Sequence, residues 1–205
     1  MTLNTFFQNV IHAAATTSIT EWVAIITALV YVALAAKENV WCWLFGIISA
    51  GIYIYLNFKI QLYLDAWLSL YYVVIGIYGW YAWVKGKTDK HAGSVLHRIT
   101  IGVLGISLLV GIVSTLILGK LSDIYTDSPV PYFDAALTSF SLVATYLTTR
   151  KILENWIFWI VIDAAYVIIY INRGLPSTAV LNLIYTFVSV YGFIKWRKHL
   201  KAFTG

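Results

Sequence analysis

The stretch IYGWYAWVK at residues 77–85 recurs as VYGFIKWRK at residues 190–198, and this recurrence decides the fold. The same offset of 113 residues aligns residues 21–85 on residues 134–198 without a gap, and 16 of the 65 positions are identical. The matched pairs of rare residue types include Trp43 with Trp156, Tyr53 with Tyr166 and Tyr72 with Tyr185. Because a biased composition seldom matches such residue types, the chain contains an internal repeat.

The composition predicts that this repeat lies in a membrane. Hydrophobic residues make up 60% of the chain and charged residues only 11%, with a mean hydropathy of +0.79. A soluble domain averages about a quarter charged residues. Seven apolar blocks follow one another, at residues 22–36, 40–56, 62–84, 99–118, 133–147, 156–171 and 178–194. Each block, with its polar flanks, approaches the roughly 20 residues that a membrane-spanning helix needs.

The repeat explains the odd number of blocks. Three helices carry the chain to the opposite side of a membrane, so a second copy that followed directly would be inverted. One extra crossing, at residues 99–118, restores the starting side and lets both copies run parallel. The predicted fold is therefore an all-α integral membrane protein with seven transmembrane helices in a 3+1+3 parallel repeat. Its predicted parts are an outer N-terminal segment (1–20), a first repeat (21–85), a linker helix with flanking loops (86–132), a second repeat (133–198) and a cytoplasmic tail (199–205).

The distribution of Lys and Arg predicts the orientation. Threading seven crossings places eleven of these residues on one side and three, Lys59, Lys120 and Arg173, on the other. Basic residues concentrate on the cytoplasmic side of membrane proteins. We therefore expect a multi-pass protein of the cytoplasmic membrane, with the N-terminus outside and the C-terminus inside.

Several other functions are disfavoured by the sequence. The net charge of +5 comes from basic residues between apolar blocks, so we expect no nucleic-acid partner. The four His residues are scattered and there is a single cysteine, Cys42, which predicts neither a metal site nor a disulfide, and no cofactor is expected. No Ser–His or paired Asp constellation indicates an enzyme. A retinal photoreceptor needs a Lys in the middle of a helix, and Lys195 lies at the end of its block.

Asp163 is the most informative intramembrane residue. It lies at the middle of its predicted helix, and a charged side chain at that depth is costly unless it has a function. Spacings of three and four residues place Trp156, Trp159 and Tyr166 on the same helical face. An aromatic wall with one carboxylate suits a flat cationic heterocycle. The alternative is that Asp163 only bonds a neighbouring helix or a loop cation.

Two further faces carry polar residues. Asn182 and Tyr185 lie on one face of the last block and offer donors and acceptors to a ligand, or to a neighbouring helix. Ser69 and Tyr72 are their equivalents in the first repeat. Five other tryptophans, Trp22, Trp41, Trp80, Trp83 and Trp196, are expected to be interface anchors rather than ligands.

These motifs resemble the PnuC family of bacterial vitamin transporters. The resemblance rests on Trp156-x-x-Trp159 with Asp163, on Asn182-x-x-Tyr185, and on Asp65-Ala66-x-Leu68 leading into Tyr78-Gly79-Trp80, and it covers about residues 20 to 198. It implies a full-length relative of the SWEET sugar transporters, a homotrimer, and a substrate held near the midplane. It also implies facilitated diffusion of nicotinamide riboside, which a cytoplasmic kinase phosphorylates so that it cannot leave. Trp156, Trp159, Asn182 and Tyr185 match the positions where the family binds substrate.

One departure bears on the substrate. Nicotinamide riboside transporters of this family tend to carry Gln where this chain has Ser69. The shorter side chain leaves thiamine as an alternative substrate, and ion-coupled uptake as an alternative mechanism. Both vitamins are flat, cationic and hydroxylated, so Asp163 does not separate them.

Overall fold

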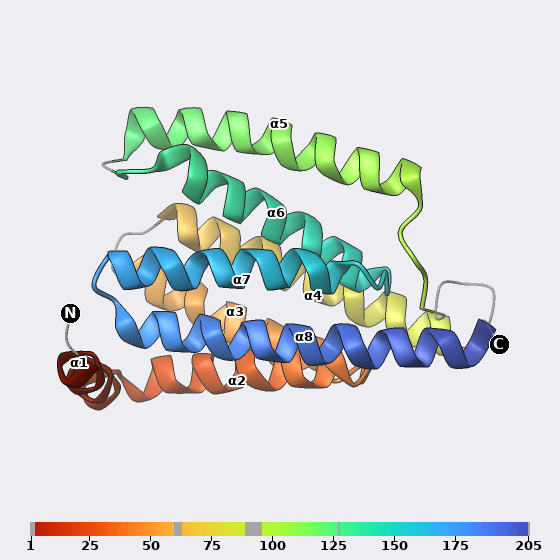
Figure 1. The fold of residues 1–205 in the computed structure, drawn as a ribbon, viewed down its shortest axis with the longest axis horizontal. Helices are drawn as coiled ribbons and strands as arrows, with labels where there is room; N and C mark the ends of the chain where they lie inside the picture. Colours follow the sequence, from red (N-terminus) through yellow and green to blue (C-terminus); the bar gives the residue numbers. More distant parts are fainter. Residues whose placement is uncertain (1–2, 60–62, 89–95, 127, 205) are drawn as a thin grey trace.

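The computed structural model describes residues 3–59, 63–88, 96–126 and 128–204. Within these residues the chain forms eight helices (Figure 1). They are α1 (Leu3–Thr16), α2 (Ile19–Ala36), α3 (Cys42–Lys59), α4 (Tyr63–Thr88), α5 (Ile101–Tyr125), α6 (Pro131–Thr149), α7 (Asn155–Asn172) and α8 (Pro176–Thr204). Each of the seven predicted apolar blocks corresponds to one of the helices α2 to α8. The blocks at 40–56 and 99–118 begin two residues before their helices, and residue 62 of the third block lies outside the described residues.

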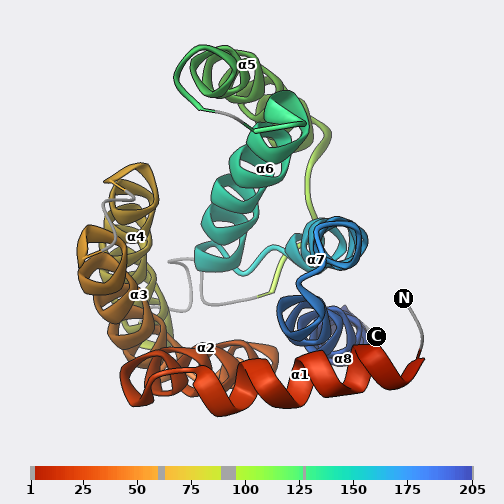
Figure 2. The ribbon, with the colours of Figure 1, turned by 90° about the vertical axis from the view of Figure 1, so that its left-hand side faces the viewer.

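Helix α1 was not predicted. Its residues fall in the predicted outer N-terminal segment, residues 1–20. It lies across one end of the bundle, roughly perpendicular to the other helices, and contacts α8 (Figure 2). The Trp22 indole at the start of α2 donates a hydrogen bond to the Ala14 carbonyl, at 3.2 Å, and so ties α1 to the bundle.

Two three-helix groups form the body of the bundle. Helices α2, α3 and α4 pack together, as do α6, α7 and α8, and the groups meet where α2 contacts α8 and α4 contacts α6 (Figure 2). Helix α5 packs against α6 alone among the described helices. A Cβ atom on Gly111 would lie 2.5 Å from the Phe140 ring, so the glycine permits this close approach of α5 to α6.

Four tryptophans pack at one end of the bundle, where the two groups meet. Trp43 and Trp83 pack edge to face at 5.5 Å, Trp156 and Trp196 do so at 5.4 Å, and Trp83 meets Trp196 at 6.2 Å. Trp83 and Trp196 are only 2% and 0% exposed, so their prediction as interface anchors was wrong. Their indoles bond across the groups instead, Trp83 to the Thr148 and Thr149 carbonyls and Trp196 to the Ala35 carbonyl. The sequence pattern could not reveal these partners.

The turns beside this tryptophan cluster have matching geometry. Glu38, between α2 and α3, and Lys151, between α6 and α7, are 113 residues apart, and both have a positive φ, of 55° and 51°. The same backbone hydrogen bond recurs in both turns: the Glu38 N–H donates to the Ala35 carbonyl, and the Lys151 N–H donates to the Thr148 carbonyl. The two side chains also meet as an ion pair, with 3.7 Å between Nζ and Oε2. Each group thus contributes one charge to the same contact.

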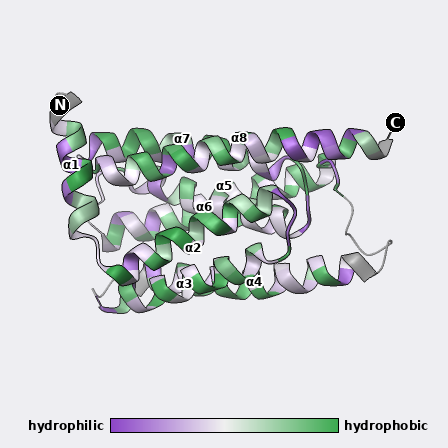
Figure 3. Ribbon diagram, turned by 90° about the horizontal axis from the view of Figure 1, so that it is seen from below, coloured by the Kyte–Doolittle hydropathy of each residue, from purple (hydrophilic) through white to green (hydrophobic). Residues whose placement is uncertain are grey.

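Apolar residues run along the length of the helices (Figure 3), and many of the large ones are exposed on the outside of the bundle. Ile101, Ile106 and Leu109 of α5 are 91%, 65% and 63% exposed, and such faces are suited to lipid rather than water. Among the described residues five helices are long and apolar enough to cross a membrane: α2, α3, α5, α7 and α8. Helix α6 is less apolar because it carries several hydroxyl residues, yet Ser141, Thr145 and Thr148 are buried and bond to carbonyls of their own helix.

Candidate substrate cavity

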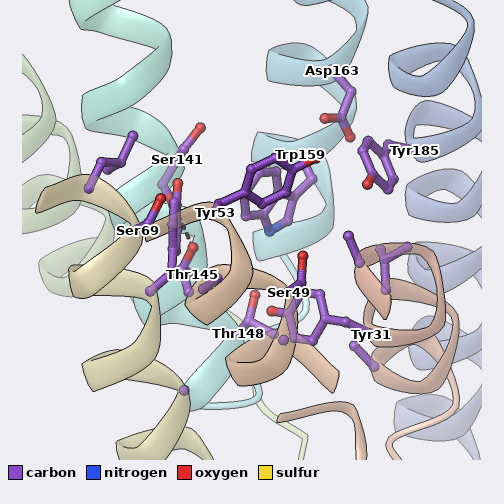
Figure 4. A pocket seen from close by; sticks show the side chains of 18 of the residues that line it. Tyr31, Ser49, Tyr53, Ser69, Ser141, Thr145, Thr148, Trp159, Asp163 and Tyr185 are labelled. Atoms are coloured by element: carbon purple, nitrogen blue, oxygen red, sulfur yellow. Dashed lines mark hydrogen bonds between the residues drawn. The ribbon is translucent and has the colours of Figure 1, made fainter. Parts of the chain in front are cut away.

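A cavity of about 390 Å³ lies inside the bundle, and all six helices of the two groups line it (Figure 4). At one end it is bounded by Trp43 and Trp156 of the tryptophan cluster and by Thr148. It extends from there to Asn57 and Asp65 toward the other end of the bundle. Most of its wall area is apolar, and aromatic rings and the side chains of ten described Ser, Thr, Asn and Asp residues face it as well. Apolar and aromatic walls with polar groups among them are usual in a site for a small organic ligand.

The lining follows the sequence repeat. Twenty of the twenty-five described lining residues form ten pairs that are 113 positions apart. Seven of these pairs differ, and the second member is then more polar or larger: Ala28/Ser141, Val32/Thr145, Ala35/Thr148, Gly46/Trp159, Ala50/Asp163, Ser69/Asn182 and Gly76/Ser189. At these seven pairs the first repeat therefore contributes the smaller or less polar side chain. Outside the pairs, the first repeat adds polar groups of its own, such as Asn57 and Asp65.

All eight candidate residues from the sequence line this one cavity. Helix α7 contributes Trp156, Trp159, Asp163 and Tyr166, helix α8 contributes Asn182 and Tyr185, and helix α4 contributes Ser69 and Tyr72. In Figure 4 the hydroxyl residues Ser69, Ser141 and Thr145 appear on one side, and Asp163 with Tyr185 on the other.

Asp163 is buried at the cavity wall with few partners. It is 5% exposed, and the Ser189 hydroxyl donates to its Oδ2 at a long 3.4 Å. No Lys, Arg or His is found among the described residues that line the cavity, whereas Asp65 also lines it. A buried carboxylate without a cation is expensive. The cavity therefore has the electrostatic character of a site for a positively charged ligand.

Asn182 and Ser69 differ in how much bonding capacity they leave for a ligand. The Asn182 amide donates to the Thr178 carbonyl of its own helix at 2.8 Å, which leaves its oxygen and a second N–H available. The Ser69 hydroxyl donates to the Asp65 carbonyl at 2.8 Å and lies 3.5 Å from the Asn57 amide nitrogen. The Trp43 and Trp156 indole nitrogens are buried and have no acceptor among the described residues.

Sequence reasoning missed part of the lining. Tyr53 and Trp43 line the cavity, and their equivalence to Tyr166 and Trp156 in the repeat was a signal that could have found them. The α6 residues Ser141, Thr145 and Thr148 follow a helical face, which was a second signal. Tyr31, Ser49 and Asn57 line the cavity without any such pattern.

Two similar groups of apolar helices around an internal cavity are an arrangement typical of membrane transporters for small solutes. The family model described as nicotinamide mononucleotide transporter matches residues 18–198. The chain belongs to this family, the PnuC family of multi-pass membrane transporters.

The relatives of this chain are named as transporters of different vitamins. The nicotinamide riboside transporter PnuC of Escherichia coli (strain K12) is 27% identical over 200 residues, covering 86% of this chain and 84% of the relative. The riboflavin/roseoflavin transporter RibM of Streptomyces davaonensis is 27% identical over 176 residues, covering 83% and 81%. A crystal structure of the vitamin B3 transporter PnuC has the same fold, with a TM-score of 0.72 and 24% identity, covering 96% of this chain and 88% of that one.

Proposed function

We propose that the protein imports nicotinamide riboside across the cytoplasmic membrane by facilitated diffusion. The observation that carries this proposal is the cavity itself, which is aromatic, contains the buried Asp163 and has no basic residue among its described lining. A pyridinium ring carries a positive charge and a flat face, so it can stack on Trp159 and compensate Asp163. A ribose presents hydroxyls, which Asn182 can bond.

The proposed transport unit has seven spans in two parallel three-helix repeats, with α5 as the linking helix. The matched cavity pairs and the matched turns at Glu38 and Lys151 support this arrangement. Helices α4 and α6 are less apolar than the other proposed spans, because they carry hydroxyl and aromatic residues such as Tyr72 and Thr145 that line the cavity. We further propose that the protein assembles as a homotrimer and that a cytoplasmic kinase traps the imported vitamin.

Ligand titration of the purified protein tests the substrate. Nicotinamide riboside, thiamine and riboflavin are added side by side, and binding is followed by calorimetry and by tryptophan fluorescence. We expect nicotinamide riboside to bind and quench fluorescence, and uncharged riboflavin to bind more weakly. Trp159→Ala and Asn182→Ala are expected to weaken binding, whereas Trp67→Ala, at a 65% exposed position outside the cavity, is a matched control. No response to either cationic vitamin contradicts the proposal.

Thiamine is the second candidate, and Ser69 is the observation that favours it. A serine at this position leaves more room in the cavity than a glutamine would. If thiamine is the substrate, it binds more tightly than nicotinamide riboside in the same titration, and Ser69→Gln reverses the order. If Ser69→Gln affects both ligands equally, this position does not select the vitamin.

Passive transport is favoured over coupled transport. A proton relay needs a chain of buried ionisable groups, and Asp163 is the one carboxylate that is buried among the described lining residues. Uptake into liposomes is therefore expected to follow the substrate gradient. A strong stimulation by a proton gradient, beyond the effect of membrane potential on a cation, contradicts a passive mechanism.

A further inference from the structure

A second cavity, of about 420 Å³, lies at the end of the bundle where α8 finishes, outside the substrate cavity. Its lining comes from residues 96–98, which precede α5, from the α6–α7 turn and from the C-terminal part of α8: Leu96, His97, Arg98, Leu153, Arg197, Leu200 and Lys201. Three of these residues are permanently basic, and none is acidic.

The walls of this cavity are held in place by the backbone. The His97 N–H donates to the Lys151 carbonyl at 3.1 Å, and the Leu153 N–H donates to the His97 carbonyl at 2.9 Å. The Arg98 side chain is held by Glu154, with 3.1 Å between Nε and Oε1, and the second oxygen of Glu154 accepts from the Ile99 N–H. The segment before α5 is thus fixed against the α6–α7 turn, and the site exists before a ligand arrives.

The charge of the cavity is not fully neutralised. Glu154 pairs with Arg98, but Arg197 makes no ion pair or hydrogen bond with any of the described residues. Arg197 and Lys201 are four residues apart and therefore lie on one face of α8. An arginine guanidinium with other cations beside it can bind the oxygens of a phosphate group through paired hydrogen bonds and charge attraction.

The floor of the cavity is apolar. Leu96 and Leu153 are 5% and 1% exposed and belong to the core around the tryptophan cluster, and Leu200 packs against it. Helix α8 has 29 residues and is therefore about 43 Å long, more than the roughly 30 Å of hydrocarbon in a bilayer. Its charged C-terminal part (Figure 3) thus reaches the headgroup level of a membrane.

We propose that this cavity binds a phosphate-bearing ligand, and its apolar floor suits the headgroup and upper acyl chain of an anionic phospholipid. The proposal does not depend on which vitamin is transported. A soluble phosphate is the other source of the same chemistry, and the experiment below separates the two.

Thermal unfolding of the delipidated protein in detergent tests the proposal. Phosphatidylglycerol, phosphatidylcholine with the same acyl chains, and inorganic phosphate at matched ionic strength are added in turn. At a hundredfold excess over the dissociation constant, a ligand of the folded state is expected to raise Tm by about 5–10 °C. The double variant Arg197→Gln/Lys201→Gln is expected to lose this increase. The matched control is Lys195→Gln/Lys198→Gln, which removes the same charge from α8 outside the cavity.

The pattern of responses decides the outcome. An increase with phosphatidylglycerol that exceeds the increase with phosphatidylcholine, and that only the cavity variant loses, identifies a lipid headgroup site. An increase with inorganic phosphate that only the cavity variant loses identifies a site for a soluble phosphate. Equal increases in the two double variants, or equal responses to the two lipids without a response to phosphate, overturn the proposal.

Discussion

Among single residues, Asp163 is the buried carboxylate of the cavity wall, and the role proposed for its charge can be tested directly. We expect Asp163→Asn to weaken binding of a cationic vitamin by about 10- to 100-fold, because a hydrogen bond or contact to a charged group contributes about 1.5–3 kcal/mol. Calorimetric titration of the purified variant measures the loss. Asp123→Asn is the matched control, since Asp123 lies exposed on α5 beside Lys120. An unchanged affinity in Asp163→Asn would show that the carboxylate has only a structural role.

Sequence alone identified residues that line the cavity, for a physical reason. A carboxylate in the middle of an apolar helix is so costly that it indicates a functional position. Helical spacing then identifies Trp159 and Tyr166 as its neighbours. Tyr31 and Ser49 could not be recognised in this way, because one aromatic or hydroxyl residue among many gives no periodic signal. They became part of the cavity only through the packing of α2 against α3 and α8.

At the scale of the element, Gly79 and Gly192 set how closely helices pack within each three-helix group. A Cβ atom on Gly79 would lie 2.5 Å from the Trp43 ring, and one on Gly192 would lie 2.7 Å from the Trp156 ring. These rings cannot shift easily, because both belong to the tryptophan cluster. We expect Gly79→Ala or Gly192→Ala to destabilise the protein by about 1–3 kcal/mol through overpacking.

Thermal unfolding in detergent checks this prediction. Gly105→Ala is the matched control, since nothing lies within 4 Å of a Cβ atom there and alanine favours a helix. The control is expected to unfold at an equal or higher temperature than the unmodified protein. If all three variants behave alike, close approach to the indoles is not what these two glycines provide.

The elements themselves were largely predictable, whereas their ends and contacts were not. The apolar blocks predicted where α2 to α8 lie. Helix α8, however, continues ten residues beyond its predicted end at residue 194, because Leu200 in its C-terminal part packs against the core around the tryptophan cluster. The repeat predicted that Trp83 and Trp196 are equivalent residues. It did not predict that they meet each other, since that contact depends on how the two groups face one another.

At the scale of the whole molecule, the Glu38–Lys151 pair joins the two groups. The two side chains are 15% and 6% exposed, and Lys151 also lies 4.8 Å over the Trp83 ring. We expect Glu38→Lys to destabilise the protein by about 3–5 kcal/mol, because it places two cations at a largely buried contact. The double variant Glu38→Lys/Lys151→Glu is expected to recover part of this loss, since the two turns have the same backbone geometry. Denaturation of both variants measures the recovery, and no recovery would indicate that other contacts of these residues dominate.

The orientation of the molecule in the membrane follows from the charge distribution combined with an odd number of spans. Ser18 precedes α2 and Ala202 lies near the end of α8, at opposite ends of the bundle (Figure 1). In a Cys42→Ser background, a single cysteine is placed at Ser18 or at Ala202, and intact cells are treated with a membrane-impermeant maleimide. Ser18→Cys is expected to react at once, and Ala202→Cys only after permeabilisation, because the basic end of the bundle stays in the cytoplasm. Labelling of both positions from the same side would contradict the predicted odd number of spans.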